Sequence, residues 1–217
     1  MDKSINFKRI IVYLLGQFIL AMGISLSVKT DLGVSPVSSV PLIFSNVFNM
    51  ELGNMTILVY VVYIFFQFLI LRKDFGIVHL LGIPCAVIFG KFVTLTNYLL
   101  RSVILVGQMM RYLMLFVSIV LIAVGLKLYM WADIVPQAAD GLVKVISDKY
   151  KIKFSTVKNG FDLTSVAVSL IVSLLFLKKI VGIREGTVIA ALLVGRVAGI
   201  IEKWFGNKTK RYLGTAL

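Results

Sequence analysis

The chain has 217 residues, of which 59% are hydrophobic and only 15% are charged, and its mean hydropathy is +0.96. This composition excludes an ordinary soluble domain, in which about 45–50% of residues are apolar and about 25% are charged. It predicts an all-α, polytopic membrane protein. The net charge of +13 fits cytoplasmic loops and anionic lipid headgroups, so we expect the lipid bilayer as a partner and no nucleic acid.

Six membrane spans are predicted along the chain. A helix needs ~20 predominantly apolar residues to cross ~30 Å of hydrocarbon. The first two spans, residues 10–28 and 52–71, contain no charged residue. We interpret the first as an uncleaved span, because a signal peptide has an apolar run of only about 7–15 residues and a small-residue cleavage site. The other four are predicted at residues 75–100, 112–132, 163–177 (starting near residue 157) and 183–205.

Two segments, residues 34–50 and 134–153, fit neither a span nor an ordinary loop. The stretch LGVSPVSSVPLIFSNVFNM, residues 32–50, has 19 uncharged residues but contains two prolines and four serines. We expect a half-inserted helix that starts at Ser35–Pro36, since irregular backbone within a membrane must be covered by protein or water. The later part of the second segment, LVKVISDKYKIKF, is amphipathic, so a helix on the membrane surface stays an alternative there.

The placement of these segments predicts an internal duplication. Asp31 precedes the first short segment and Asp133 precedes the second, at an offset of 102 residues. A glycine followed by a cation recurs in the last span of each half, at residues 90–91 and 195–196. Three spans per half place the halves in opposite orientations, so we expect two inverted three-span repeats, a pattern found in secondary transporters. The repeats are predicted at residues 1–106 and 107–217, within one membrane domain.

The positive charges predict the orientation. With six spans and the N-terminus inside, fourteen lysines and arginines fall on the inner side and six on the outer side. This asymmetry favours cytoplasmic N- and C-termini. The cluster Lys178, Lys179 and Arg184 opposes this orientation, because it falls on the outer side.

The two halves, with TDLGVSPVSS following the first span, resemble the bacterial YczE/YyaS/YitT group of integral membrane proteins. The resemblance covers most of the chain and implies a small polytopic inner-membrane protein. It implies no catalytic or binding residues. The second copy departs from the first, since Pro136 lies two positions before the equivalent of Pro36 and Asp140 stands where the first copy has Ser38.

Two cations within spans, Lys91 and Arg196, are candidate substrate-binding residues. A cation in the middle of a membrane costs about 2.5 kcal/mol or more, and the matched positions suggest a central site for an anion. The alternative is that each side chain reaches the nearer headgroups. The preceding glycines, Gly90 and Gly195, are expected to allow close helix packing.

The tips of the two short segments provide the remaining candidates. Ser35, Ser38 and Ser39 can cap a helix that starts at Pro36, and the amides of such a helix start attract anions. In the second copy Asp140 and Gly141 hold the corresponding place. We therefore expect these five residues to line a cavity for a substrate.

The leading functional hypothesis is transport, or facilitated permeation, of a small anionic or zwitterionic solute. The alternative is a non-transporting membrane module that acts as an assembly or regulatory partner of another membrane protein. No catalytic motif is found, so we expect no enzyme and no cofactor. A single histidine and a single cysteine argue against a dedicated metal cluster. Whether the protein forms a homo-oligomer stays open.

Overall fold

The computed structural model describes residues 6–215, and helices make up most of this part of the chain, with no strand. This confirms the all-α prediction. Six helices are long: α1 (Phe7–Thr30), α3 (Leu52–Leu71), α5 (Gly82–Leu99), α6 (Gln108–Ala132), α8 (Phe154–Val172) and α9 (Glu185–Ile201). The shorter elements are α2 (Pro36–Phe48), η1 (Arg72–Asp74), α4 (Ile77–Leu80), α7 (Ala138–Tyr150), η2 (Ser173–Leu177), η3 (Glu202–Gly206) and α10 (Asn207–Leu213).

The protein is a multi-pass membrane protein. Five helical stretches are long and apolar enough to cross a membrane: Phe7–Thr30, Leu52–Asp74, Ile77–Leu99, Gln108–Ala132 and Phe154–Leu177. The sixth predicted span, residues 183–205, corresponds to α9 together with η3, and α9 alone has 17 residues. Lys3, one of the charges used to predict the orientation, lies outside the described residues.

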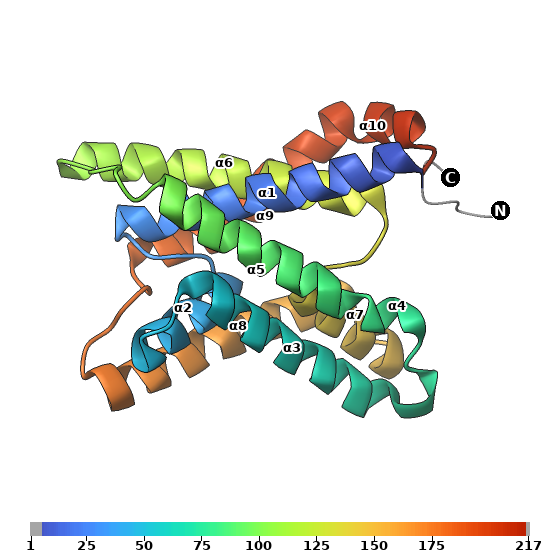
Figure 1. Ribbon diagram of the computed structural model, residues 1–217, viewed down its shortest axis with the longest axis horizontal. Coiled ribbons are helices and arrows are strands. Elements are labelled where there is room, and N and C mark those ends of the chain that lie inside the picture. The colour runs from blue at the N-terminus through green and yellow to red at the C-terminus, as the bar shows by residue number, and fades with distance from the viewer. Residues whose placement is uncertain (1–5, 216–217) are drawn as a thin grey trace.

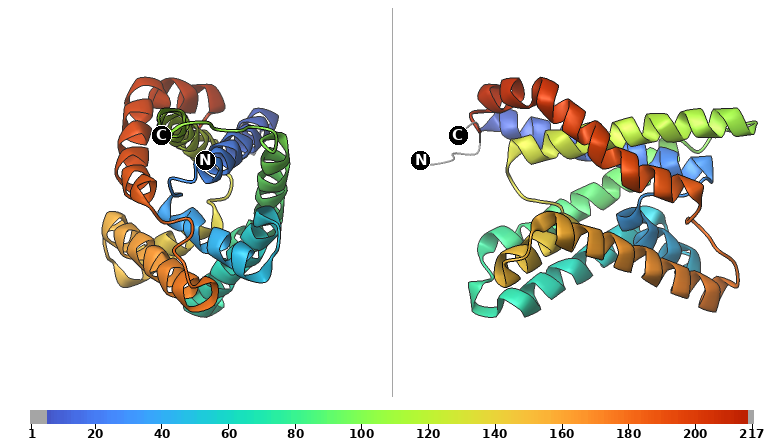
Figure 2. Two further views of the ribbon diagram at one scale, coloured as in Figure 1. Left: turned by 90° about the vertical axis from the view of Figure 1, so that its left-hand side faces the viewer. Right: turned by 180° about the vertical axis from the view of Figure 1, so that it is seen from behind.

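The long helices form two layers joined by two crossing helices. α1 and α6 run antiparallel side by side in one layer, while α3 and α8 lie in the other (Figure 1). α5 crosses between the layers on one face of the molecule and α9 crosses on the opposite face (Figure 2). The short helices α2 and α7 both pack against α3 and α8 (Figures 1 and 2).

Close backbone contact joins α1 to α6. A Cβ atom on Gly125 would lie 2.4 Å from the backbone nitrogen of Leu20, and one on Gly23 would lie 2.8 Å from that of Ile122. Neither position accepts a larger residue unless the helices separate. Contact of this kind is how small residues let membrane helices associate.

The offset of 102 residues recurs throughout the structure. α1 and α6 end at residues 30 and 132, α2 and α7 end at 48 and 150, and α3 and α8 begin at 52 and 154. Both aspartates that follow the first span of their half adopt left-handed backbone conformations, with φ of 54° at Asp31 and 47° at Asp133. These residues end the helices and turn the chain toward the short segments.

Contacts between elements follow the same offset. Arg111 pairs with Asp31 at 3.7 Å, and Arg9, 102 residues earlier, donates to the backbone oxygen of Asp133. The hydroxyls of Ser39 and Ser169 are 2.9 Å apart. Their positional equivalents are in contact too, because a Cβ on Gly141 would lie 3.1 Å from Nε2 of Gln67. α2 therefore packs against α8 and α7 packs against α3, each across the boundary between the halves.

The short segments form regular helices after tight turns. Helix α2 starts at Pro36, as predicted, and a proline at the first helical position removes one of the backbone amides that a helix start leaves unpaired. No side chain caps this start, since the hydroxyl of Ser35 donates instead to Ser38. In α7 most residues before Asp148 are buried. Its last three residues are exposed, so only the end of α7 has the character of a surface helix.

Candidate functional site

A central cavity of about 600 Å³ lies where the first turns of α2 and α7 meet. Its lining includes residues 35–38 from the first tip and residues 133–137, 139 and 140 from the second. Leu20 and Tyr60, from near the middles of α1 and α3, line it as well. Both tips therefore lie level with the middles of these helices. Most of the remaining lining side chains come from α6, α8 and α9, and those of α9 are small and apolar.

A network of amide and hydroxyl groups holds the second tip. Gln137, just before α7, donates from Nε2 to Oε1 of Gln17 on α1, at 3.3 Å. It accepts from the hydroxyl of Tyr60 on α3, at 3.1 Å. Gln67 of α3 donates to the backbone oxygen of Ala138, at 2.9 Å. These bonds satisfy buried polar groups and fix the start of α7 against the first half of the chain.

One side of the cavity carries a cluster of charged groups. The ammonium of Lys158 lies 3.2 Å from Oδ1 of Asp140 and 3.3 Å from Oδ1 of Asp162. Tyr129 of α6 donates its hydroxyl to the second oxygen of Asp140, at 2.6 Å. We name Asp140, Lys158 and Asp162 the charge triad. Its formal charge is −1, because two carboxylates share one ammonium.

Two further lysines line the cavity. Lys127 is neutralised by Glu202 at 3.2 Å. The same carboxylate binds Lys210 at 2.6 Å and accepts from the indole of Trp131 at 2.8 Å. Lys144, one turn after Asp140 on α7, has no ion-pair partner within residues 6–215. It is the cation available to a charged solute without breaking an existing pair.

The structure brings together only some of the residues that the sequence suggested. Ser35, Ser38 and Asp140 line the central cavity. Ser39 is buried behind the tip, where its hydroxyl also donates to the backbone oxygen of Pro36. Gly141 faces away from the central cavity, toward Gln67.

Lys91 and Arg196 are exposed, and neither lines a described cavity. The glycines before them explain this placement. Gly90 faces α3 and Gly195 faces the cavity, and consecutive residues of a helix point about 100° apart. A cation that follows an inward-facing glycine therefore points away from it.

Sequence reasoning missed Lys158 as a site residue and treated it as a loop charge. α8 begins well before the apolar run at residues 163–177, so Lys158 and Asp162 lie four residues apart on one face of the same helix. The spacing of oppositely charged residues at i and i+4 is the signal that identifies this pair. Tyr129 carries no comparable signal, because it lies in an otherwise apolar helix.

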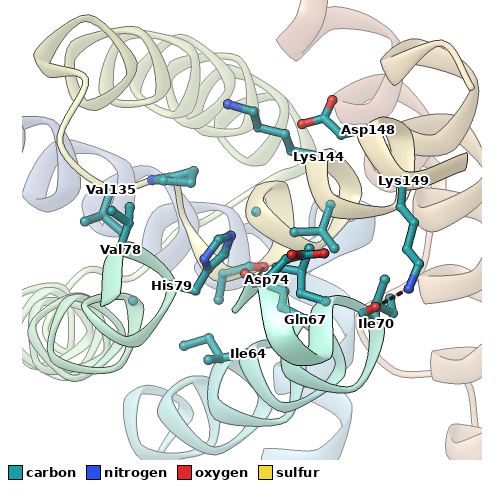
Figure 3. A pocket seen from close by; sticks show the side chains of 16 residues that line it. Ile64, Gln67, Ile70, Asp74, Val78, His79, Val135, Lys144, Asp148 and Lys149 are labelled. Atoms are coloured by element: carbon teal, nitrogen blue, oxygen red, sulfur yellow. Dashed lines mark hydrogen bonds between the residues drawn. The ribbon is translucent and has the colours of Figure 1, made fainter. Parts of the chain in front are cut away.

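A second cavity, of about 570 Å³, lies on the other side of α7, between α7, α3 and α4. Figure 3 shows Gln67 and His79 on the side of α3 and α4, with Lys144 and Asp148 opposite them on α7. Lys149 closes one edge by donating to the backbone oxygen of Ile70 (Figure 3). This cavity shares Val135, Pro136 and Lys144 with the central one. Within residues 6–215, no three His, Cys, Asp or Glu side chains are grouped closely enough to hold a metal ion.

Comparison with known proteins places this architecture in a family. Residues 7–203 match the model of a family of unknown function, DUF6198. The chain belongs to this family. It is 27% identical over 204 residues to the uncharacterized protein YyaS of Bacillus subtilis (strain 168). The aligned region covers 92% of this chain and 96% of that protein. This agrees with the resemblance noted in the sequence. No solved structure matches the chain.

Proposed function

We propose that this member of the DUF6198 family carries a small zwitterionic or anionic solute across the membrane through the central cavity. The observation that supports this function best is that the tips of α2 and α7, far apart in sequence, line one cavity together with the charge triad. Ionisable side chains within membrane segments are costly and mark solute or ion pathways. The solute crosses unchanged, so the proposal includes no chemical step.

The proposed architecture is a pair of inverted three-span repeats. The offset of 102 residues in helix ends and in helix contacts supports it, as does the antiparallel packing of α1 and α6. We place both termini in the cytoplasm, from the excess of lysine and arginine on that side. In known transporters with such repeats, the binding site lies near the bilayer midplane between the repeats, where half-helices end.

The charged groups suggest which parts of the solute bind where. A carboxylate of the solute has Lys144 as a partner, together with the backbone amides at the start of α2, since helix N-termini attract anions. An ammonium group has Asp140 and Asp162, which share one lysine. The polar side chains of the first tip that line the cavity are the neutral hydroxyls of Ser35 and Ser38. All the charged side chains that line the cavity therefore belong to the second half of the chain.

A binding screen tests the proposal. The purified protein is heated with a panel of amino acids, betaines and small carboxylates, and any compound that raises the melting temperature is then tested for uptake into proteoliposomes. We expect Asp140→Asn and Lys144→Gln to abolish both the shift and the uptake. Lys91→Gln and Arg196→Gln are matched controls, because they remove cations that lie outside the cavity.

The outcomes separate the two hypotheses. Uptake that survives in Asp140→Asn and Lys144→Gln but is lost in the two control variants would move the site to the outer face of the helices. If no compound of the panel shifts the melting temperature or enters the vesicles, the transport proposal fails. The role as a partner of another membrane protein then takes its place.

A further inference from the structure

The two halves differ in one helix contact. In the first half, α3 packs tightly against α5. A Cβ on Gly53 would lie 2.3 Å from the backbone oxygen of Gly90, and one on Gly90 would lie 2.6 Å from that of Gly53. The backbones of α3 and α5 touch there, so no passage exists between them.

The equivalent helices of the second half, α8 and α9, make no comparable contact within residues 6–215. Their glycines Gly160, Gly195 and Gly199 have open space, because an added Cβ would meet no atom within 4 Å. The central cavity fills part of the space between them. α8 contributes Phe154, Lys158 and Asn159 to its lining, and α9 contributes Val194, Gly195 and Ala198.

A loop spans the separation between α8 and α9 at one end. Their near ends are joined by residues 178–184 (Figure 2). This connection is tied to the first half, since Val34 donates its backbone N–H to the oxygen of Gly182 at 3.0 Å. Arg184 pairs with Asp31 at 3.2 Å. Phe154 and Ala198 lie toward the opposite ends of the two helices, which no loop connects.

We propose that the solute enters and leaves the central cavity between α8 and α9, and that the α3–α5 contact is the equivalent passage in its closed form. The solute's use of this passage rests on the transport function proposed above. In the proposed orientation the ends of α8 and α9 that no loop connects face the cytoplasm, and Lys127, Lys144 and Lys158 line the cavity. Closure of α8 on α9 and separation of α3 from α5 then turn the same cavity toward the other side, in the manner of paired repeats that rock about a fixed site.

Labelling of a cysteine inside the cavity tests this passage without any solute. The reporter is Ser35→Cys in a Cys85→Ala background, because Cys85 is the chain's one cysteine. The probe is a charged, water-soluble maleimide, added to the full-length protein in detergent. We expect Gly195→Trp to slow labelling about tenfold, since an indole buries ~150–250 Å² of surface and would occupy the space beside the cavity.

Gly199→Trp is the matched control. Gly199 lies one turn further along α9 in equally open space, but it does not line the cavity. A second pair stands on the opposite wall, where Asn159 lines the cavity and Gly160 does not. We expect Asn159→Trp to slow labelling and Gly160→Trp to leave it unchanged. This pair decides the test if Gly195→Trp unfolds.

The proposal is overturned if the lining variants label at the rate of their parent, or if the control variants slow labelling equally. The melting temperatures of all four variants are measured to check that each variant is folded. If no compound of the panel binds but the lining variants slow labelling, the transport function is rejected and the passage between α8 and α9 is supported. If a solute is taken up but the lining variants do not slow labelling, the transport function is supported and the solute enters by another route.

Discussion

Replacing Lys158 with methionine should destabilise the protein through the charge triad. The change makes the formal charge of the triad more negative, from −1 to −2, because Asp140 and Asp162 lose the ammonium that lies 3.2 and 3.3 Å from them. Loss of one partner from a fully buried pair costs about 3–5 kcal/mol. Between 23% and 28% of each of these side chains is exposed, so solvent screening reduces the expected cost to about 1–3 kcal/mol.

Thermal unfolding in detergent measures this cost. For a chain of this size, 1 kcal/mol corresponds to about 2–4 °C in melting temperature. Lys144→Met is the matched control, because it removes a lysine of the same cavity that has no ion-pair partner in the described part of the chain. Its melting temperature should stay close to that of the unmodified protein.

A double variant decides whether charge is the cause. Lys158→Met with Asp162→Asn returns the formal charge of the triad to −1, so it should recover part of the lost stability. Asp162→Asn alone makes the triad neutral and should not destabilise the protein. The electrostatic reasoning is refuted if the double variant melts no higher than Lys158→Met alone.

Two further substitutions test how the halves are joined. Gly125→Ala should lower the melting temperature by several degrees, because its methyl group would lie 2.4 Å from the nitrogen of Leu20 and overpacking costs about 1–3 kcal/mol. Gly199→Ala, in open space, should raise it slightly through helix propensity; equal effects would contradict the packing argument. Ser39→Ala should cost about 1 kcal/mol by leaving the Ser169 hydroxyl without this partner. The Ser39→Ala/Ser169→Ala double variant should recover part of that loss, and additive losses in the same unfolding assay would argue against a shared hydrogen bond.

The spans and the short segments could be predicted from sequence because each depends on local composition. Uncharged runs of about 20 residues have few alternatives to a membrane span, and a proline after a serine favours a helix start. The pair Asp31 and Asp133 indicated the spacing of 102 residues that the helix ends share. These properties need no knowledge of how helices pack.

The site was harder to predict, because it depends on the direction in which each side chain points. Asp140 was chosen because it follows the second tip, and it lines the central cavity. Lys91 and Arg196 were chosen for their depth within the spans, but their depth is independent of the face of the helix on which they lie. Lys158 was overlooked because α8 starts before the apolar run that marks the span. Helix rotation and helix starts are set by tertiary packing, which periodicity alone does not determine.

The exchange of short helices between the halves has a consequence for biosynthesis. α2 packs against α8, through Ser39 and Ser169, and α8 is made more than 100 residues after α2. While the ribosome is still adding the second half, α2 therefore has no final neighbour on that side. α7 finds α3 already made, and Gln67 is ready to bind the backbone oxygen of Ala138. During insertion into the membrane, the side of α2 that packs against α8 stays unoccupied until α8 arrives. A chain that stops before α8 therefore leaves α2 without its contact to Ser169.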